Sequence, residues 1–159
     1  MEPRIEILKE KKLIGHHIQT SLIKDETFKL WSGFMPQKKE IKNICGNNLY
    51  SVRIYKLPLK EPKDFEQNIE KWATMEVRTF DDIPENMHSL VLEGGLYAVF
   101  NYTGLNTDVS IFNYIYDVWI SSSIYNLDNR PHFEVLGKNY KNNDPTSEEE
   151  IWIPIKLKV

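Results

Sequence analysis

The sequence predicts an α+β fold of two related strand–helix–strand–strand units, each with antiparallel strands and one main helix, that enclose a cleft along a pseudo-twofold axis. Alternating apolar and polar residues predict short strands along most of the chain. Two stretches with apolar residues at helical spacing each follow an aspartate that can cap a helix, Asp25 and Asp108. The order of elements in residues 1–80 recurs in residues 85–159, which indicates a duplication within a single domain, 1–159.

Composition limits the classes of protein to which the chain can belong. The formal net charge is −3 and the basic residues are dispersed, which disfavours a nucleic-acid-binding surface. Cys45 is the only cysteine, so no internal disulfide can form, as expected in a reducing cytoplasm. No apolar run approaches the roughly 20 residues of a membrane-spanning helix. We therefore expect a soluble, cytoplasmic protein without direct nucleic-acid or membrane partners.

The first unit is predicted from periodicity and turn residues. A helix after Asp25 is indicated by apolar residues at helical spacing: Phe28, Leu30, Trp31, Phe34 and Met35. Pro36 interrupts this helix, and residues 38–45 predict a further helical turn or two before the turn at 46–48. The predicted strands of this unit are residues 3–9, 13–22, 50–55 and 69–77.

The second unit repeats this order. Residues 89–92 and 96–102 alternate like strands on either side of Glu93-Gly94-Gly95, and a helix is predicted from Asp108 to about Tyr125. The two glycines lack the strand–loop–helix context of a phosphate-binding loop, so no cofactor is expected. The units align at three points: EKKLIGHH at 10–17 with EGGLYAVF at 93–100, Arg53 with Glu134, and Trp72 with Trp152. A chance match of short apolar patterns is the alternative explanation.

Residues 131–137 and 151–157 predict the last two strands and one wall of a ligand site. Because side chains alternate across a sheet, Glu134 and Leu136 share one face of the first strand. Aliphatic residues make the core face of the second strand, which leaves Trp152 on its other face. We expect the carboxylate and the indole to lie on the same wall. A carboxylate among apolar groups is costly to desolvate unless a partner compensates it, which singles out Glu134.

Further candidates follow from the expected architecture. Each helix covers one face of its sheet, which leaves the other faces free to enclose the cleft. We expect Trp72 and Tyr97 on those free faces, with Trp119 as a further lining residue whose helical stripe also suits the core. Arg53 is ambiguous, because pairing with Glu134 would neutralise the pocket and favour neutral or anionic ligands. The four histidines are not placed to bind one metal ion.

Four separated segments carry a resemblance to a known family: GGLYAVFNYTG at 94–104, DVWISSSIY at 117–125, NRPHFEVLG at 129–137 and EEEIWIPIK at 148–156. Together they resemble the GyrI-like, or effector-binding, domain family. The segments at 30–43 and 71–77 are similar to its integron-associated, stand-alone subgroup. The resemblance implies a pocket between two pseudo-symmetric units, in which Glu134 meets cationic, often aromatic, ligands beside Trp152. Residues 119–125 lack the Pro and Gly of the family's helix motif, which affects the expected shape of the helix end.

Three functions remain open on the sequence. The first is a stand-alone binding protein for cationic or amphipathic aromatic compounds, which would need a partner protein for any regulatory role. The second is a hydrolase of electrophilic small molecules with Glu134 as general base, ranked below binding because no nucleophile with its own base is evident. The third is a protein-interaction module similar to a gyrase inhibitor. The acidic run at 148–150 is expected to be a solvated loop edge.

Overall fold

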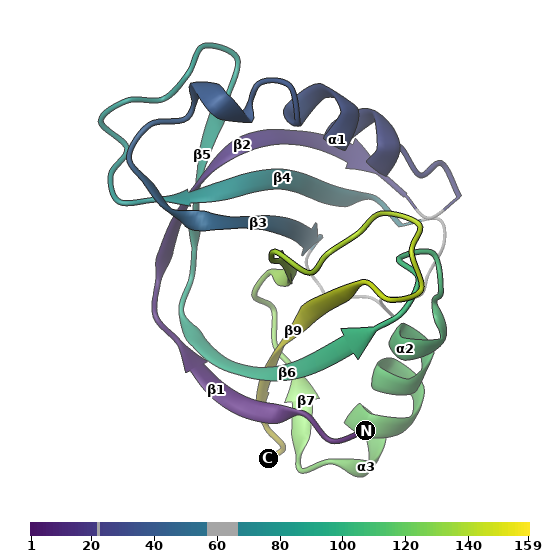
Figure 1. Ribbon diagram of the computed structural model, residues 1–159. Coiled ribbons are helices and arrows are strands. Elements are labelled where there is room, and N and C mark those ends of the chain that lie inside the picture. The colour runs from purple at the N-terminus through teal and green to yellow at the C-terminus, as the bar shows by residue number, and fades with distance from the viewer. Residues whose placement is uncertain (22, 57–66) are drawn as a thin grey trace.

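Nine antiparallel strands dominate the structure, a computed structural model that describes residues 1–21, 23–56 and 67–159. Their order is β1-β6-β9-β8-β3-β4-β2-β5, and β7 adds to β9 outside this path. Figure 1 shows a strongly curved sheet, with α1 over β2 and β4 and with α2 and α3 towards its other end. No helix among the described residues is long and apolar enough to cross a membrane.

The elements follow the predicted order closely. The strands of residues 1–80 are β1 Arg4–Leu8, β2 Lys11–Thr20, β3 Ile44–Tyr55 and β4 Ile69–Val77. The strands of residues 85–159 are β5 His88–Leu92, β6 Gly95–Thr103, β7 Tyr125–Leu127, β8 His132–Leu136 and β9 Glu148–Leu157. The helical elements are α1 Thr27–Phe34, the 3₁₀ turn η1 Lys38–Glu40, α2 Ser110–Asn113, the π-helical η2 Tyr114–Trp119 and α3 Ile120–Ser122. The last three are continuous, and we call them the second helical segment.

Two aspartates accept hydrogen bonds from the first helical residues, one residue before the N-cap positions that Glu26 and Val109 occupy. The Asp25 carboxylate accepts the backbone N–H of Thr27 at 3.0 Å, and the Asp108 carboxylate accepts that of Ser110 at 2.9 Å. These bonds satisfy N–H groups that lack intrahelical partners in a first turn.

Two local predictions were wrong. Of the helical turns expected at 38–45, only Lys38–Glu40 is helical, and Cys45 already belongs to β3. The second helical segment ends at Ser122 rather than near Tyr125, and Tyr125 instead begins the short strand β7.

The strands of each half remain neighbours in the sheet, but the edge strands are exchanged. The run β6-β9-β8 meets the run β3-β4-β2 at the β3–β8 pair. β1 pairs with β6 of the other half, and β5 pairs with β2. Each half therefore completes the sheet edge of the other.

Apolar clusters cover both faces of the sheet. One cluster joins α1 to β2 and β4, and a second joins the second helical segment to β6 and β9. A third lies on the opposite face and consists of Leu8, Leu13, Tyr50, Val52, Trp72, Leu92, Tyr97, Val99 and Phe133. We call the face under the two helical segments the helix face, and the face that carries the third cluster the aromatic face.

Candidate functional site

The strand register places Glu134 and Trp152 on opposite faces of the sheet. Across β8 and β9, Phe133 lies opposite Trp152 and Glu134 lies opposite Ile151. Directly paired residues point to the same face, so Trp152 belongs with Phe133 on the aromatic face and Glu134 with Ile151 on the helix face. The expectation that the carboxylate and the indole share a wall was therefore wrong. Both faces are buried here, so apolarity alone did not identify which faces match.

The aromatic candidates pack together away from Glu134. Trp152 stacks on Phe133 with ring centroids 5.2 Å apart, and Trp72 is buried in the same cluster. Tyr97 is fully buried, and its hydroxyl donates a hydrogen bond of 2.7 Å to the Pro131 carbonyl. The structure does not bring these three predicted lining residues to Glu134, because they fill the aromatic face.

Two other candidates lie on the helix face. Leu136 is buried and, two residues beyond Glu134 on β8, points to the same face. Trp119 is buried in the cluster under the second helical segment, beside Phe100. This position matches the core role that its helical stripe allowed.

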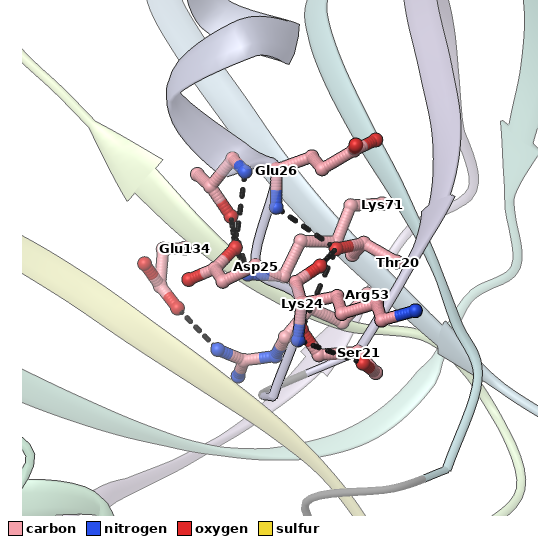
Figure 2. Close-up of polar contacts among 9 residues, drawn as sticks. Thr20, Ser21, Lys24, Asp25, Glu26, Arg53, Lys71 and Glu134 are labelled. Atoms are coloured by element: carbon pink, nitrogen blue, oxygen red, sulfur yellow. Dashed lines mark hydrogen bonds and ion pairs between the residues drawn. The ribbon is translucent and has the colours of Figure 1, made fainter.

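A row of basic side chains crosses the centre of the helix face. Lys71 on β4 lies opposite Arg53 on β3, and Arg53 lies opposite His132 on β8. Glu134 is the next residue of β8 on this face. Arg53 Nη1 donates to Glu134 Oε1 at 2.7 Å, with side chains only 14% and 17% exposed (Figure 2). The predicted ambiguity of Arg53 is thus resolved: it pairs with Glu134.

The second helical segment supplies one side of the site. The guanidinium carbon of Arg53 lies 4.9 Å from the ring centroid of Phe112, within cation–π range. Tyr116 and the Nδ1 atom of His132 share a buried hydrogen bond of 3.0 Å. Tyr116 belongs to the π-helical part of this segment, a rare conformation that is frequent at functional sites.

The start of α1 supplies the other side. Lys71 Nζ lies 3.6 Å from the Asp25 carboxylate and donates to the Thr27 hydroxyl at 2.7 Å. Figure 2 shows Asp25 close to the Arg53–Glu134 pair, below the helix. The site therefore lies above the β3–β8 pair, between the two helical segments. We call it the central cluster; it contains Asp25, Arg53, Lys71, Tyr116, His132, Glu134 and Glu149.

Glu149 completes the central cluster from β9. It precedes Ile151 by two residues and so faces the helix side, where it is half-buried. Burial and the nearby charge of Glu134 raise the pKa of Glu149 to about 8. The expectation that residues 148–150 form a solvated loop edge was wrong: they begin β9, and only Glu148 is exposed.

Burial sets the protonation of the other members of the cluster. It lowers the pKa of Lys71, and with the charges of Arg53 and Arg130 it lowers the pKa of His132 well below its usual value. Burial also raises the pKa of Tyr116. Burial alone would lower the pKa of Arg53, but the electrostatic effects of Tyr55 and Glu134 outweigh burial and raise this pKa. At neutral pH His132 is therefore neutral and Arg53 is charged.

Comparison with known proteins gives the family of the chain. Residues 4–155 match the Cass2 family, described as integron-associated effector binding protein. The chain belongs to this family. No curated protein sequence matches it.

Three solved structures resemble this effector-binding protein along nearly its whole length. SAV2435 bound to tetraphenylphosphonium is 18% identical with a TM-score of 0.68, and the match covers 98% of this chain and 94% of that one. The EcmrR C-terminal domain is 12% identical with a TM-score of 0.69, covering 99% and 98%. A hydrolase from Listeria innocua is 10% identical with a TM-score of 0.59, covering 98% and 92%. At these identities the likeness shows a shared fold.

Sequence reasoning missed five residues of this effector-binding protein's central cluster: Asp25, which was predicted only as a helix cap, Lys71, Tyr116, His132 and Glu149. The signal that could have found them is register. Once Arg53 is taken as a site residue, its cross-strand partners on β4 and β8 are Lys71 and His132. Those pairings join strands from both halves of the chain, and local periodicity does not specify them.

An open surface hollow lies elsewhere on the effector-binding protein. It measures about 580 Å³ and is lined by residues around Gly95 and Arg130. The Arg130 guanidinium lies 4.7 Å from the Tyr97 ring centroid and donates to the carbonyls of Leu96 and Ile155. These bonds join β6 to β9, so Arg130 has a structural role.

Proposed function

We propose that the protein binds a small organic molecule, cationic or amphipathic and aromatic, at the central cluster. The observation that carries this proposal is the set of largely buried charged side chains between the two helical segments: Arg53, Glu134 and Lys71. Desolvating such ions costs several kcal/mol each, and apolar residues of similar volume often stabilise a fold as well or better. Recognition of a ligand gives these charges a role that stability does not.

Unsatisfied polar atoms support a ligand at the same place. In the described part of the chain, four buried side-chain nitrogens have no hydrogen-bond partner, and three of them belong to the central cluster: Arg53 Nε, Arg53 Nη2 and His132 Nε2. Buried polar atoms without partners are rare and costly in folded proteins. A bound molecule with hydrogen-bond acceptors, or its water, would satisfy them.

The relatives support the chemical class of the ligand. The family is described as effector-binding, and SAV2435, which shares the fold, was solved with the aromatic cation tetraphenylphosphonium. Phe112 and Tyr116 give the central cluster aromatic surface next to Arg53 and His132. Each well-placed ring would contribute roughly 0.5–2 kcal/mol to a bound cation.

We further infer that the two halves form one domain with a pseudo-twofold axis between β3 and β8. The strand orders β6-β9-β8 and β2-β4-β3 support this inference, as does the direct pairing of Val52 with Phe133 at the centre. Trp72 pairs with Val52 as Trp152 pairs with Phe133. On this arrangement Arg53 and Glu134 occupy equivalent positions that face each other across the axis.

A regulatory role, if the protein has one, would pass through a partner protein. EcmrR supports this view, because its C-terminal domain shares the fold and the longer EcmrR chain was solved in a DNA complex. The present chain covers 58% of that longer chain. Co-purification with and without ligand would test whether a partner associates in a ligand-dependent way.

The binding proposal is tested with two ions of nearly equal shape and opposite charge. Isothermal titration should show that tetraphenylphosphonium binds more tightly than tetraphenylborate. Glu134→Gln should weaken the cation by roughly 10-fold to 100-fold, because it removes a carboxylate and leaves Arg53 uncompensated. Glu148→Gln, at the exposed first residue of β9, is the matched control and should change little. Equal cation affinity in both variants, with both folded by circular dichroism, would refute the proposal.

A hydrolase is the second candidate, and the shared fold of the Listeria innocua hydrolase favours it. The geometry speaks against Glu134 as a general base, because Arg53 already engages its carboxylate at 2.7 Å. Steady-state assays with electrophilic esters and epoxides would decide. Turnover that is abolished in Glu134→Gln would establish hydrolase activity and would rule out a role limited to binding.

A further inference from the structure

Glu149 has no cationic partner in the central cluster. Arg53 forms an ion pair with Glu134 at 2.7 Å, and Lys71 forms one with Asp25 at 3.6 Å. Among the described residues, the side chain of Glu149 makes neither a hydrogen bond nor an ion pair. Its neighbours in sequence differ: Glu148 accepts from the Asn139 amide, and Glu150 from Arg4.

The groups that face Glu149 come from every element around it. Tyr102 on β6 lies directly opposite it in the register. Glu134 lies one residue pair away on β8, on the same face, and Arg53 reaches over from β3. Tyr140 lies in the segment between β8 and β9, and the charges of Glu149 and Glu134 contribute to its raised pKa. Arg53, already paired with Glu134, is the only positive charge in this group.

Counting charges shows why this carboxyl differs from the others. With every acid ionised, the central cluster would hold three carboxylates, Asp25, Glu134 and Glu149, against the two cations Arg53 and Lys71. The excess negative charge would fall on the half-buried Glu149, where low dielectric and the adjacent Glu134 make ionisation unfavourable. In the free protein Glu149 therefore retains its proton at neutral pH.

The cluster is also incomplete as a hydrogen-bonded unit. The unpartnered nitrogens of Arg53 and of His132 lie in the same group of side chains, and His132 is fully buried. This observation does not depend on the number of carboxylates in the cluster. Together the two observations indicate a site with one carboxyl group that no cation balances and with buried nitrogens that lack a partner among the described residues.

We propose that Glu149 exchanges its proton for the positive charge of the ligand. Resting on the proposed function, this inference specifies an organic monocation that takes its place beside Glu149. The carboxyl O–H bond breaks, the proton passes to solvent, and the carboxylate then balances the ligand charge. The charge of the cluster is unchanged, so a cation enters without leaving an uncompensated ion in the sheet.

The other neighbouring groups do not titrate in the range where Glu149 does. Burial raises the pKa of Tyr140 to about 12 and also raises that of Tyr102. The pKa of Arg53 is raised, and that of His132 is well below its usual value. Between about pH 6 and about pH 9 these four groups keep one protonation state. Proton release in this range would therefore come from the carboxyl groups of the site or from Lys71, whose pKa burial lowers, and Glu149→Gln distinguishes the two sources.

Calorimetry tests the exchange directly. Tetraphenylphosphonium is titrated into the protein between about pH 6 and about pH 9, in buffers with different ionisation enthalpies. Close to one proton should leave per cation bound near pH 7, and affinity should rise about tenfold per pH unit until it levels near pH 8. Glu149→Gln should abolish both effects, and Glu148→Gln should preserve them. Cation binding without proton release, or a pH slope retained in Glu149→Gln, would overturn the proposal.

A measurement on the free protein separates this inference from the proposed function. Carboxyl ¹³C resonances assigned through Glu149→Gln should show Glu149 titrating near pH 8 without ligand. Titration near pH 4 to 5 would overturn the exchange even if cations bind. Titration near pH 8 with no cation bound by the wild type would overturn the binding function, and the exchange with it.

Discussion

The two faces of the central strands show opposite solutions to burial. On the aromatic face, Trp72, Val52, Phe133 and Trp152 lie side by side across four strands and pack as an apolar cluster. One residue along the same strands, the helix face carries Lys71, Arg53 and His132, with Glu134 next on β8. The comparison shows that a single step of register separates an apolar cluster from the charged residues that we propose bind a ligand.

The aromatic face should dominate stability. Phe133→Ala removes a fully buried ring that contacts Trp152, Tyr97 and Tyr50, and should lower the free energy of unfolding by about 3–5 kcal/mol in urea titrations. Phe28→Ala, at a residue 83% exposed, is the control and should stay within about 0.5 kcal/mol. A loss below about 1 kcal/mol for Phe133→Ala would contradict a structural role for this face.

Breaking the ion pair of the helix face should have the next largest effect. Arg53→Leu leaves Glu134 buried without its partner and should cost about 2–4 kcal/mol of unfolding free energy. The double variant Arg53→Leu/Glu134→Leu should recover most of that loss, because the cost comes from the uncompensated charge. If chemical denaturation shows the double variant to be as unstable as the single one, the pair is a stabilising element and the contrast between the faces fails.

The pH dependence of stability sharpens the contrast within the helix face. The pKa of Glu149 is raised in the folded protein, so the folded state holds a proton that the unfolded state releases above about pH 4 to 5. Stability from this group is complete below that range and is lost as pH rises to about 8. Glu149→Gln should remove this loss and stabilise the protein at pH 8 by on the order of 1–3 kcal/mol. Thermal unfolding from about pH 5 to about pH 9 measures it; parallel curves for both proteins would contradict it.

The smallest effect should come from reshaping the aromatic face without emptying it. Trp152→Phe keeps a ring against Phe133 and should cost less than about 1.5 kcal/mol. Affinity for tetraphenylphosphonium should stay within about twofold, because Trp152 and Glu134 point to opposite faces. A tenfold weakening in titration calorimetry would place the ligand on the aromatic face and reverse the assignment of the two faces.

Much of the fold was predictable because local patterns specify it. Helix caps at Asp25 and Asp108, the strand at 69–77 and the order of elements in both halves follow from periodicity and capping chemistry. β7 was not predicted because a strand of three residues is too short to show a clear alternation of apolar and polar residues. The end of the second helical segment was misjudged because the apolar residues around Tyr125 suit a helix and a strand equally well.

The candidate site was predictable in part. Glu134 and the possibility of an Arg53 partner were evident from residue chemistry and alignment of the halves. Glu134 and Trp152 were wrongly predicted to share a wall because β9 is apolar on one side and aromatic on the other, and the curved sheet buries both sides. Glu149 was predicted to be solvated because a run of three acidic residues is normally exposed to solvent. Its partial burial depends on β6 and β8, which are distant from it in the sequence.

The exchange of edge strands constrains how this architecture can be divided. A half-length chain ending before β5 would keep β1 without its partner β6 and would expose the flank of β2 that β5 covers. Unpaired flanks of this kind pair readily with another chain. Such a fragment would therefore be prone to self-association through its unpaired strands, which the single chain avoids because each half covers the open edge of the other.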